Sequence, residues 1–197
     1  MNFDYPPDAT PLDPDELKGL RLSHITTRAE LDRWEQDNII EAETWAFRKK
    51  NLTTEDLLSV DFIRQLHKRM FGSVWRWAGE FRSSEKNIGI QPWAIGSALK
   101  NLLEDVIFWV EQSVFPPDEI AARFHHRLVA IHPFANGNGR HARLMADLLL
   151  VHTLKQPRFS WGRKNLVQAG ECRERYISAL QAADGRDYEP LFEFVRS

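Results

Sequence analysis

The chain has 197 residues and a mass of 23.0 kDa, which suits one domain with a single apolar core. Its net charge of −2 gives no bulk electrostatic reason to expect direct nucleic-acid binding. A single cysteine excludes an internal disulfide, and the N-terminus has neither the basic nor the apolar region of a signal peptide. No apolar run approaches the length of a membrane-spanning helix, so we expect a cytoplasmic protein without a membrane partner.

The N-terminal part is expected to begin with an extended or irregular segment, because residues 1–22 are rich in proline and acids. Thr27 and Glu30 then form a capping box, in which two side chains and two backbone N–H groups satisfy one another at a helix start. Apolar residues at helical spacing predict that this helix runs to about residue 49. A second helix is predicted over residues 55–70, ending before a glycine.

The middle of the chain contains the only strand-like pattern. Residues 74–82 are rich in tryptophan and phenylalanine, which fits either a nucleic-acid stacking surface or a buried turn. The length and alternation of residues 83–93 predict a short β-hairpin. Further helices are predicted over residues 95–112, 117–131, 143–154, 165–182 and 190–196. The expected fold class is therefore all-α with one small β-hairpin.

The helix predicted over residues 143–154 is apolar on nearly every side, so we expect it to be the central buried helix. Asp147 lies inside this apolar sequence. A buried carboxylate is costly unless it is paired, so Asp147 must have a partner in the folded chain.

The stretch directly before that helix, residues 132–143, reads His-Pro-Phe-Ala-Asn-Gly-Asn-Gly-Arg-His-Ala-Arg. Gly137, Asn138 and Gly139 form a tight glycine-flanked loop, in which positive φ angles bring backbone N–H groups close to a ligand. A glycine turn that leads into a helix N-terminus binds anions well.

The charges in this stretch favour the same interpretation. Helix N-termini prefer acids, yet the first turn here carries Arg140, His141 and Arg143. Each cation costs roughly 0.3–1 kcal/mol at that position, and a bound anion would remove the conflict. Two guanidiniums beside a glycine turn suit a polyphosphate. His132 stands just before the loop, where an imidazole could deprotonate a hydroxyl nucleophile.

This stretch resembles the signature of the Fic family, whose members transfer part of a nucleotide onto protein hydroxyl groups. Trp77-Ala-Gly followed by Arg82 is similar to a second segment of that family. The resemblance implies a Fic domain over residues 52–197, preceded by an N-terminal arm and helix over residues 1–51. It also implies ATP as the substrate, Mg²⁺ as the metal and a protein as the acceptor of AMP or another nucleoside monophosphate.

The resemblance also assigns roles to individual residues. His132 would be the catalytic base. The glycine loop would hold the α- and β-phosphates through Gly137, Asn138 and Gly139. The two arginines, Arg140 and Arg143, would hold the β- and γ-phosphates. A flap would dock the target protein by strand-like pairing: Asn87, Ile88, Gly89, Ile90 and Gln91.

One position departs from the family pattern. Members normally carry Asp or Glu, which binds magnesium, where this chain has Asn136. An asparagine keeps an oxygen ligand at the same reach but removes the charge. We therefore expect weak metal binding by residue 136.

Two features of the N-terminal part suggest regulation. Residues 10–16 and 24–31 resemble the subgroup called mobile mystery protein B. Members of this subgroup are typically encoded beside a small helix-turn-helix protein. The resemblance therefore implies a toxin-like role for this chain and a helix-turn-helix protein as its antitoxin-like partner. Many Fic proteins also have an inhibitory helix with Ser/Thr-x-x-x-Glu. Thr26 and Glu30 have that spacing, although the capping box already explains Glu30.

Two other functions stay open at this point. The loss of the acid at Asn136 could leave a module that binds a nucleotide or a partner protein with weak or no transferase activity. Alternatively, the histidines near the signature could bind a metal for hydrolysis. Those histidines are His125, His126, His132 and His141.

Overall fold

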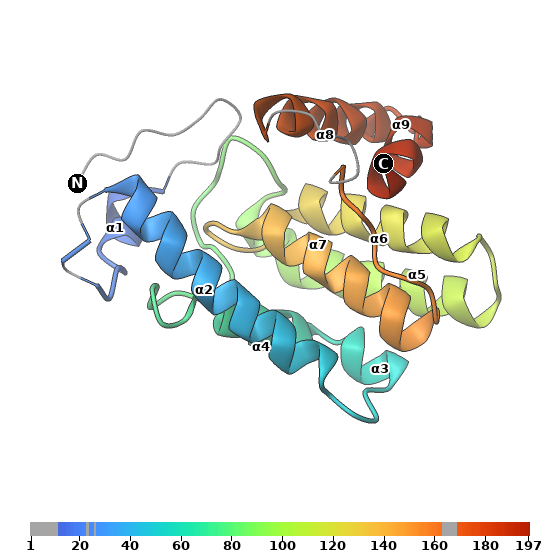
Figure 1. Ribbon diagram of the computed structural model, residues 1–197, viewed down its shortest axis with the longest axis horizontal. Helices are drawn as coiled ribbons and strands as arrows, with labels where there is room; N and C mark the ends of the chain where they lie inside the picture. Colours follow the sequence, from blue (N-terminus) through green and yellow to red (C-terminus); the bar gives the residue numbers. More distant parts are fainter. Residues whose placement is uncertain (1–11, 23, 26, 163–168) are drawn as a thin grey trace.

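The computed structural model describes residues 12–197, except residues 23, 26 and 163–168 (Figure 1). The described chain is helical, and its helices are α1 (Pro14–Leu17), α2 (Arg28–Phe47), α3 (Thr54–Leu57), α4 (Val60–Phe71), α5 (Ile95–Glu111), α6 (Pro117–Ile131), α7 (Asn138–Leu148), α8 (Ala169–Asp184) and α9 (Glu189–Arg196). A 3₁₀ turn, η1 (Pro92–Ala94), precedes α5, and a π-helical turn, η2 (Leu149–Thr153), extends α7. The predicted all-α class is confirmed.

Local side chains decide where several helices begin. The Thr27 hydroxyl accepts from the Glu30 N–H at 3.3 Å, and the Glu30 carboxylate accepts from the Thr27 N–H at 3.1 Å, so the predicted capping box is confirmed. The prediction of a single helix over residues 55–70 is wrong, because this stretch forms two helices, α3 and α4, that are separated at residues 58–59. The Ser59 hydroxyl accepts from the Phe62 N–H at 3.1 Å and starts α4 as a new helix.

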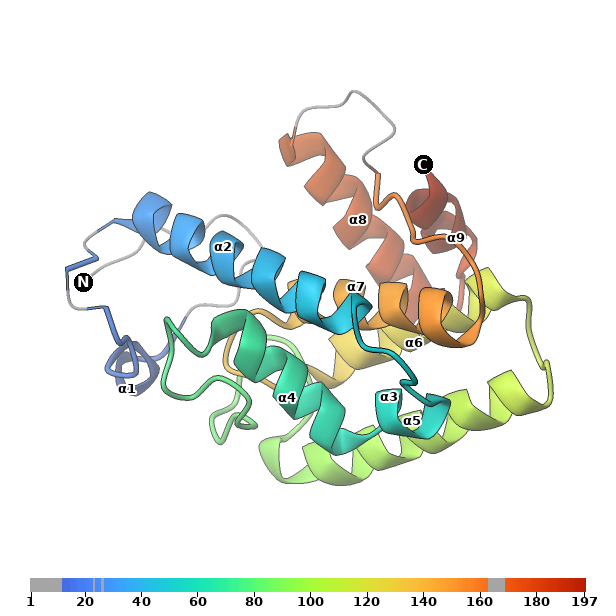
Figure 2. The same ribbon diagram turned by 60° about the horizontal axis from the view of Figure 1, so that its bottom comes forward.

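Helix α7 occupies the middle of the bundle (Figures 1 and 2). It contacts α6 on one side and α2 and α4 on the other. Leu144, Met145 and Leu148 on α7 are buried, which agrees with the apolar sequence expected of a central helix. Helices α8 and α9 pack against each other, and α9 contacts α6. Their buried side chains form a second apolar cluster beside the main core, to which α4, α5, α6 and α7 contribute. None of the described helices combines the length and apolar character needed to cross a membrane.

The N-terminal segment is less irregular than its sequence suggests. Part of it forms α1, and the Arg76 N–H donates to the Gly19 carbonyl at 2.9 Å. The Lys86 ammonium lies 2.9 Å from a carboxylate oxygen of Asp13 and 2.5 Å from one of Glu16. The N-terminal segment therefore packs against residues 76–86, which follow α4, and holds them in place. Residues 1–11 lie outside the described residues.

The predicted β-hairpin is not present. Residues 83–91 form no strand, and in the part of the chain that the structure describes the only β-bridge joins Leu20 to Trp75. Backbone groups of this segment are hydrogen-bonded to other parts of the chain. The Ile90 N–H donates to the Ile131 carbonyl at 3.4 Å, and the Ser84 carbonyl accepts from the Arg82 guanidinium at 2.9 Å. The backbone of this segment therefore pairs with a side chain and a helix end rather than with a second strand.

Asp147 on α7 has the partners that its burial demands. Its carboxylate accepts from the Phe159 N–H at 3.2 Å, the Trp161 indole N–H at 3.1 Å and the Arg158 guanidinium at 3.2 Å. Burial nevertheless raises the pKa of Asp147 above its usual value, although Arg158 opposes this. The residue ties α7 to the segment that leads to α8.

We expect Asp147→Ala to lower the free energy of unfolding by about 3–5 kcal/mol, because it leaves buried donors without an acceptor. Asp147→Asn keeps one oxygen acceptor and should lose less. Urea denaturation of the two variants and the parent chain measures both differences. Equal stability of Asp147→Ala and the parent chain would contradict the structural role.

Candidate active site

His132 stands at a sharp turn between α6 and the signature loop. It has a left-handed backbone (φ 54°, ψ 61°), and its N–H donates to the Leu128 carbonyl at 3.3 Å, which closes the end of α6. Its side chain is 5 % exposed. A left-handed conformation is costly for a residue with a Cβ, so the surrounding contacts must hold it there.

The loop after His132 is closed by its own residues. The Asn138 amide accepts from the Phe134 N–H at 2.9 Å and donates to the Phe134 carbonyl at 2.8 Å. Phe134 is fully buried, and its ring stacks on that of His67 at a centroid distance of 3.7 Å. Asn138 therefore uses its side chain to hold the loop, and only its backbone N–H is left to face an anion.

The glycine at the start of α7 is required by space and by conformation. Gly137 has φ 80°, and a Cβ there would lie 2.5 Å from the Phe71 ring. The Gly137 N–H donates to the Asn136 side-chain oxygen at 2.7 Å. Its carbonyl accepts the His141 N–H at 2.9 Å, which begins the α7 hydrogen-bond pattern. The N–H groups of Asn138, Gly139 and Arg140 belong to the first turn, where helix N–H groups lack helical partners.

The two signature arginines face different neighbours. Arg140 donates to the Glu35 carboxylate at 2.6 Å and lies over the Phe71 ring at 4.8 Å. Arg143 lies over the Tyr176 ring of α8 at 5.1 Å, and it makes no ion pair with any described residue. The arginines are three residues apart as expected, yet of the two only Arg140 has an acidic partner among the described residues.

Sequence reasoning missed Glu35. This residue of α2 is 3 % exposed, and its second carboxylate oxygen accepts from the Trp75 indole N–H at 2.6 Å. Nothing in the sequence separates it from the other acids of a polar helix. A buried carboxylate needs a cation, so Glu35 and Arg140 stabilise each other.

Residue 136 does not fit a magnesium ligand. The Asn136 side-chain oxygen accepts from the Gly137 N–H at 2.7 Å and from the Arg140 guanidinium at 3.4 Å. A cation directed at this oxygen opposes the approach of a second cation. Throughout the described ranges, no three His, Cys, Asp or Glu side chains gather in a way that could hold a metal ion.

The predicted flap passes directly over the predicted base. Gly89 has φ 100°, and a Cβ there would lie 2.5 Å from the Cβ of His132. Asn87, Ile88 and Gln91 are exposed on its outer side. The segment therefore has the expected position without the expected strand conformation.

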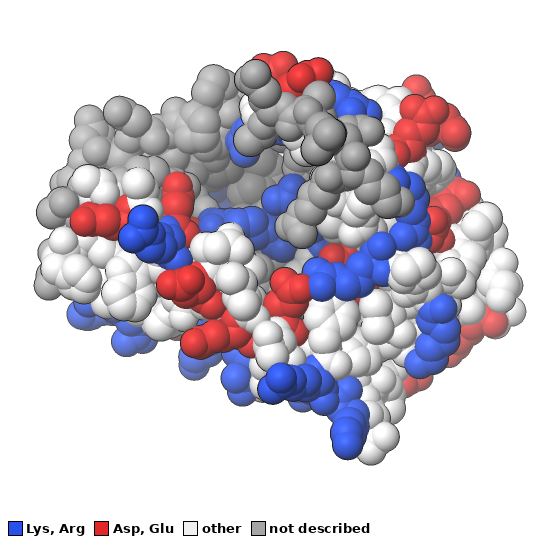
Figure 3. All heavy atoms as spheres, in the orientation of Figure 1, with Lys and Arg blue, Asp and Glu red and all other residues white. Residues whose placement is uncertain are grey.

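The environment of His132 keeps its imidazole neutral. Burial lowers the pKa of His132 to about 4; the positive charges of Arg82 and Lys86 act in the same direction, and a hydrogen bond to the Val129 backbone opposes them. At pH 7 the ring can therefore accept a proton. Figure 3 shows Lys and Arg side chains within a hollow on the face that also carries the N-terminal end of α7.

Residues 57–150 match the model of the Fic/DOC family. This chain carries a Fic/DOC family domain. Two curated relatives are the protein adenylyltransferase Fic of Aedes aegypti, 32 % identical over 144 residues, and the protein adenylyltransferase fic-1 of Caenorhabditis elegans, 28 % identical over 144 residues. Each alignment covers 71 % of this chain but 27 % of the relative, so the chain spans about a quarter of their length.

Solved structures share the fold of the Fic domain. BepC of Bartonella tribocorum, solved with bound AMPPNP, has a TM-score of 0.67 at 16 % identity, covering 93 % of this chain and 97 % of that one. Fic-1 of C. elegans has a TM-score of 0.65 at 24 % identity, covering 91 % and 51 %. At these identities the likeness shows the helical fold alone.

The other histidines of the Fic domain are not arranged as metal ligands. A ring nitrogen of His125 lies 2.9 Å from the Tyr176 hydroxyl, one of His126 lies 2.8 Å from an Asp184 carboxylate oxygen, and one of His141 lies 3.0 Å from the Ile63 carbonyl. These partners are spread over the fold, so the hydrolase interpretation has no ligand cluster among the residues described.

The residues predicted to inhibit the Fic domain are only partly described. Thr26 lies outside the described residues. The Glu30 carboxylate hydrogen-bonds the Thr27 N–H at the start of α2, and the side chain is exposed. The acid of α2 that meets a signature arginine is Glu35. The inhibitory role of Glu30 stays a prediction.

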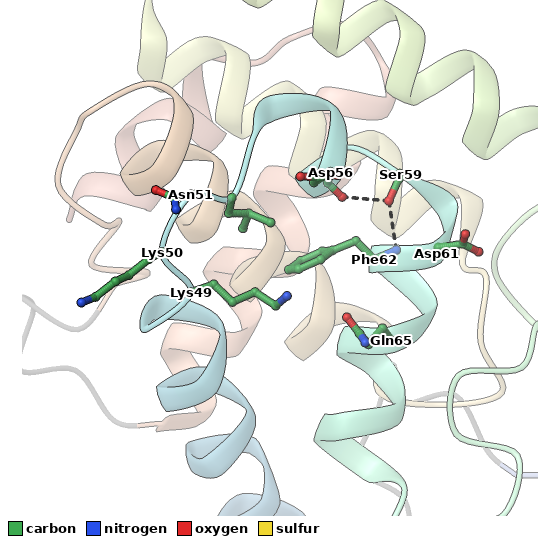
Figure 4. Close-up of a pocket in the computed structure, with 9 residues that line it drawn as sticks. Lys49, Lys50, Asn51, Asp56, Ser59, Asp61, Phe62 and Gln65 are labelled. Carbon is green, nitrogen blue, oxygen red and sulfur yellow. Dashed lines mark hydrogen bonds between the residues drawn. The ribbon is translucent and has the colours of Figure 1, made fainter.

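A cavity of about 370 Å³ lies away from the signature loop, between the end of α2 and the start of α4 (Figure 4). Lys49, Lys50, Asp56 and Asp61 line it, so its charges cancel. The Ser59 hydroxyl in its wall donates to the Asp56 carbonyl at 2.8 Å and is committed to the cap of α4. This cavity offers no group for the chemistry that the signature loop supports.

We expect His132 to titrate with a pKa of about 4, whereas an exposed histidine titrates near 6.5. Because the folded pKa is depressed, the unfolded chain binds the proton first, and the free energy of unfolding falls as the pH drops from about 6.5 towards 4. Histidine NMR titration, assigned with His132→Ala, measures this. A ring that is half protonated at pH 6.5 would contradict its burial beneath the flap.

Proposed function

We propose that this Fic domain transfers AMP from ATP to a hydroxyl side chain of a target protein. One observation carries the proposal: the buried, neutral His132 lies against Gly89 of the flap and, in the chain, five residues before the glycine turn that starts α7. The names of the curated relatives and the AMPPNP bound to BepC support it.

The proposed reaction is an exchange at the α-phosphorus. His132 takes the proton of the target hydroxyl, and the hydroxyl oxygen forms a bond to the α-phosphorus of ATP. The bond from that phosphorus to the oxygen bridging the α- and β-phosphates breaks, and pyrophosphate leaves with the electron pair. The chain contributes positioning and charge stabilisation, as phosphoryl chemistry generally requires.

The phosphates would lie at the N-terminal end of α7. Gly137, Asn138 and Gly139 shape the turn, and the backbone N–H groups of the first helical turn would face the α- and β-phosphates. Arg143, which lacks an ion pair among the described residues, would hold the terminal phosphates. Arg140 would assist, with its charge partly offset by Glu35.

We derive no step through magnesium, because the Asn136 oxygen already accepts from the Gly137 N–H and Arg140. The contacts at this loop favour charge compensation of the triphosphate by the arginines and the helix N-terminus. A metal ion that arrives with the triphosphate would receive a neutral oxygen at best from residue 136.

The remaining expectations belong to the same proposal. We propose a protein acceptor that docks along residues 87–91, a cytoplasmic location, and regulation by a small helix-turn-helix or antitoxin partner or by Thr26 and Glu30. The division into an N-terminal part, 1–51, and a Fic domain, 52–197, also stays a proposal. The alternative of a nucleotide-binding module without transferase activity is not favoured, since the buried His132 and the glycine turn that leads into α7 both support the transfer reaction.

His132→Ala should lower the turnover of AMP transfer by about 10²–10⁴-fold and leave the affinity for AMPPNP nearly unchanged, because the imidazole faces the acceptor oxygen. Arg143→Ala should weaken AMPPNP binding about tenfold or more, because it removes a charged contact to phosphate. Calorimetry measures the affinity. Label from α-³²P-ATP on proteins of a cell lysate, located by mass spectrometry, measures transfer.

The exposed Arg48→Ala is the matched control for loss of a cation and should change neither quantity. A large loss of AMPPNP affinity in His132→Ala would contradict its role as the base. Nucleotide binding without any transfer by the parent chain would support the binding-module alternative instead.

Asn136→Asp should move half-saturation of transfer to lower magnesium concentration, because it adds a charged oxygen ligand beside the phosphate turn. A magnesium titration of the transfer rate measures this. The exposed Asn101→Asp on α5 adds the same charge elsewhere and should leave the titration unchanged. An unshifted curve in Asn136→Asp would show that residue 136 does not approach the metal.

A further inference from the structure

A single buried side chain joins the flap to the end of α6. The Arg82 guanidinium donates to two carbonyls at the helix end, those of His132 at 2.6 Å and Ile131 at 3.5 Å. It also donates to two carbonyls of the following segment, those of Ser84 at 2.9 Å and Ile90. Arg82 is 5 % exposed, so these carbonyls replace water for the guanidinium.

The geometry of the guanidinium makes this contact specific. Arginine has five N–H donors fixed in one plane, and Arg82 directs them at carbonyls from two separate stretches of chain. The end of a helix carries partial negative charge on its last carbonyls, which favours a cation there. The Arg82 backbone N–H also donates to the Pro133 carbonyl at 3.0 Å, so the residue is fixed on both sides of His132.

The flap has few other links on its inner side. It forms no strand, and the Ile90 N–H to the Ile131 carbonyl is the only backbone hydrogen bond between residues 84–91 and α6 among those described. On the opposite side, Lys86 pairs with Asp13 and Glu16 near α1. Loss of Arg82 would therefore separate the flap from His132 while the attachment to α1 stays.

We propose that Arg82 is a positioning residue that holds the flap at a fixed separation from His132 and so sets the path by which a target hydroxyl reaches the imidazole. Gly89 lies against His132, so the flap cannot move closer to His132 without a steric clash. The catalytic consequence rests on the proposed transfer of AMP. The structural link between the flap and His132 does not, and it can be tested by itself.

Two substitutions separate the charge of Arg82 from its geometry. Arg82→Lys keeps a positive charge but cannot reach four carbonyls in one plane, whereas Arg82→Gln removes the charge as well. Arg196→Gln is the matched control, because Arg196 also donates to two backbone carbonyls, those of Pro157 and Arg158, far from the signature loop in sequence. Circular dichroism and thermal unfolding of each full-length variant establish that it is folded.

The first measurement is amide hydrogen exchange at Ile90. Both Arg82 variants should exchange this amide about tenfold to a hundredfold faster than the parent chain, since opening the flap no longer breaks bonds to the guanidinium. The second is the NMR titration of His132. Its pKa should rise in Arg82→Gln, from loss of a nearby positive charge, and rise less in Arg82→Lys. Arg196→Gln should change neither.

The third measurement is labelling of lysate proteins from α-³²P-ATP at varied ATP concentration. Both variants should lose at least about tenfold in maximal rate with the KM for ATP nearly unchanged, because Arg82 contacts no phosphate-binding residue. Parental Ile90 exchange in folded Arg82→Gln would overturn the proposal, as would parental labelling by a variant whose flap has opened. If the parent chain does not label proteins, the proposed function fails while exchange and titration still decide the role of Arg82.

Discussion

The site depends on the two hydrogen bonds between the Asn138 amide and the backbone of Phe134. They turn the chain between α6 and α7 into a closed loop, so that the end of one helix and the start of the next face the same space. Phe134, stacked on His67, ties that loop to the core. His67 also accepts from the Gly79 N–H at 2.9 Å and donates to the Asn136 carbonyl at 3.0 Å, which fixes its tautomer and joins the two segments that resemble the family.

Around this loop, the two signature arginines have different charge environments. Glu35 neutralises Arg140 from α2, and Trp75 holds the second oxygen of the same carboxylate. Arg143 on the next turn faces an aromatic ring instead of an acid. Because Arg143 has no acidic partner among the described residues, this arrangement is better satisfied with an anion present than without one.

His132 and the segment over it are held by a different kind of contact. His132 has a left-handed backbone and a buried ring, and both are costly for a histidine. Arg82 offsets this cost with charge-assisted hydrogen bonds to the carbonyls around the turn. The neutral state of the imidazole follows from the same contacts, since burial and the neighbouring cations both oppose its protonation.

Features that depend on near neighbours in the chain were predictable from the sequence. Thr27 and Glu30 start α2 as expected, Pro117 starts α6, and the glycine turn leads into the central helix. Contacts between distant segments were decided only in the tertiary structure. Glu35 meets Arg140 across 105 residues, and Arg82 takes the carbonyls that a strand would have paired, so the expected hairpin does not form. The physical reason is that side-chain periodicity records which residues are buried, whereas a hydrogen bond or an ion pair is set by which groups meet in space.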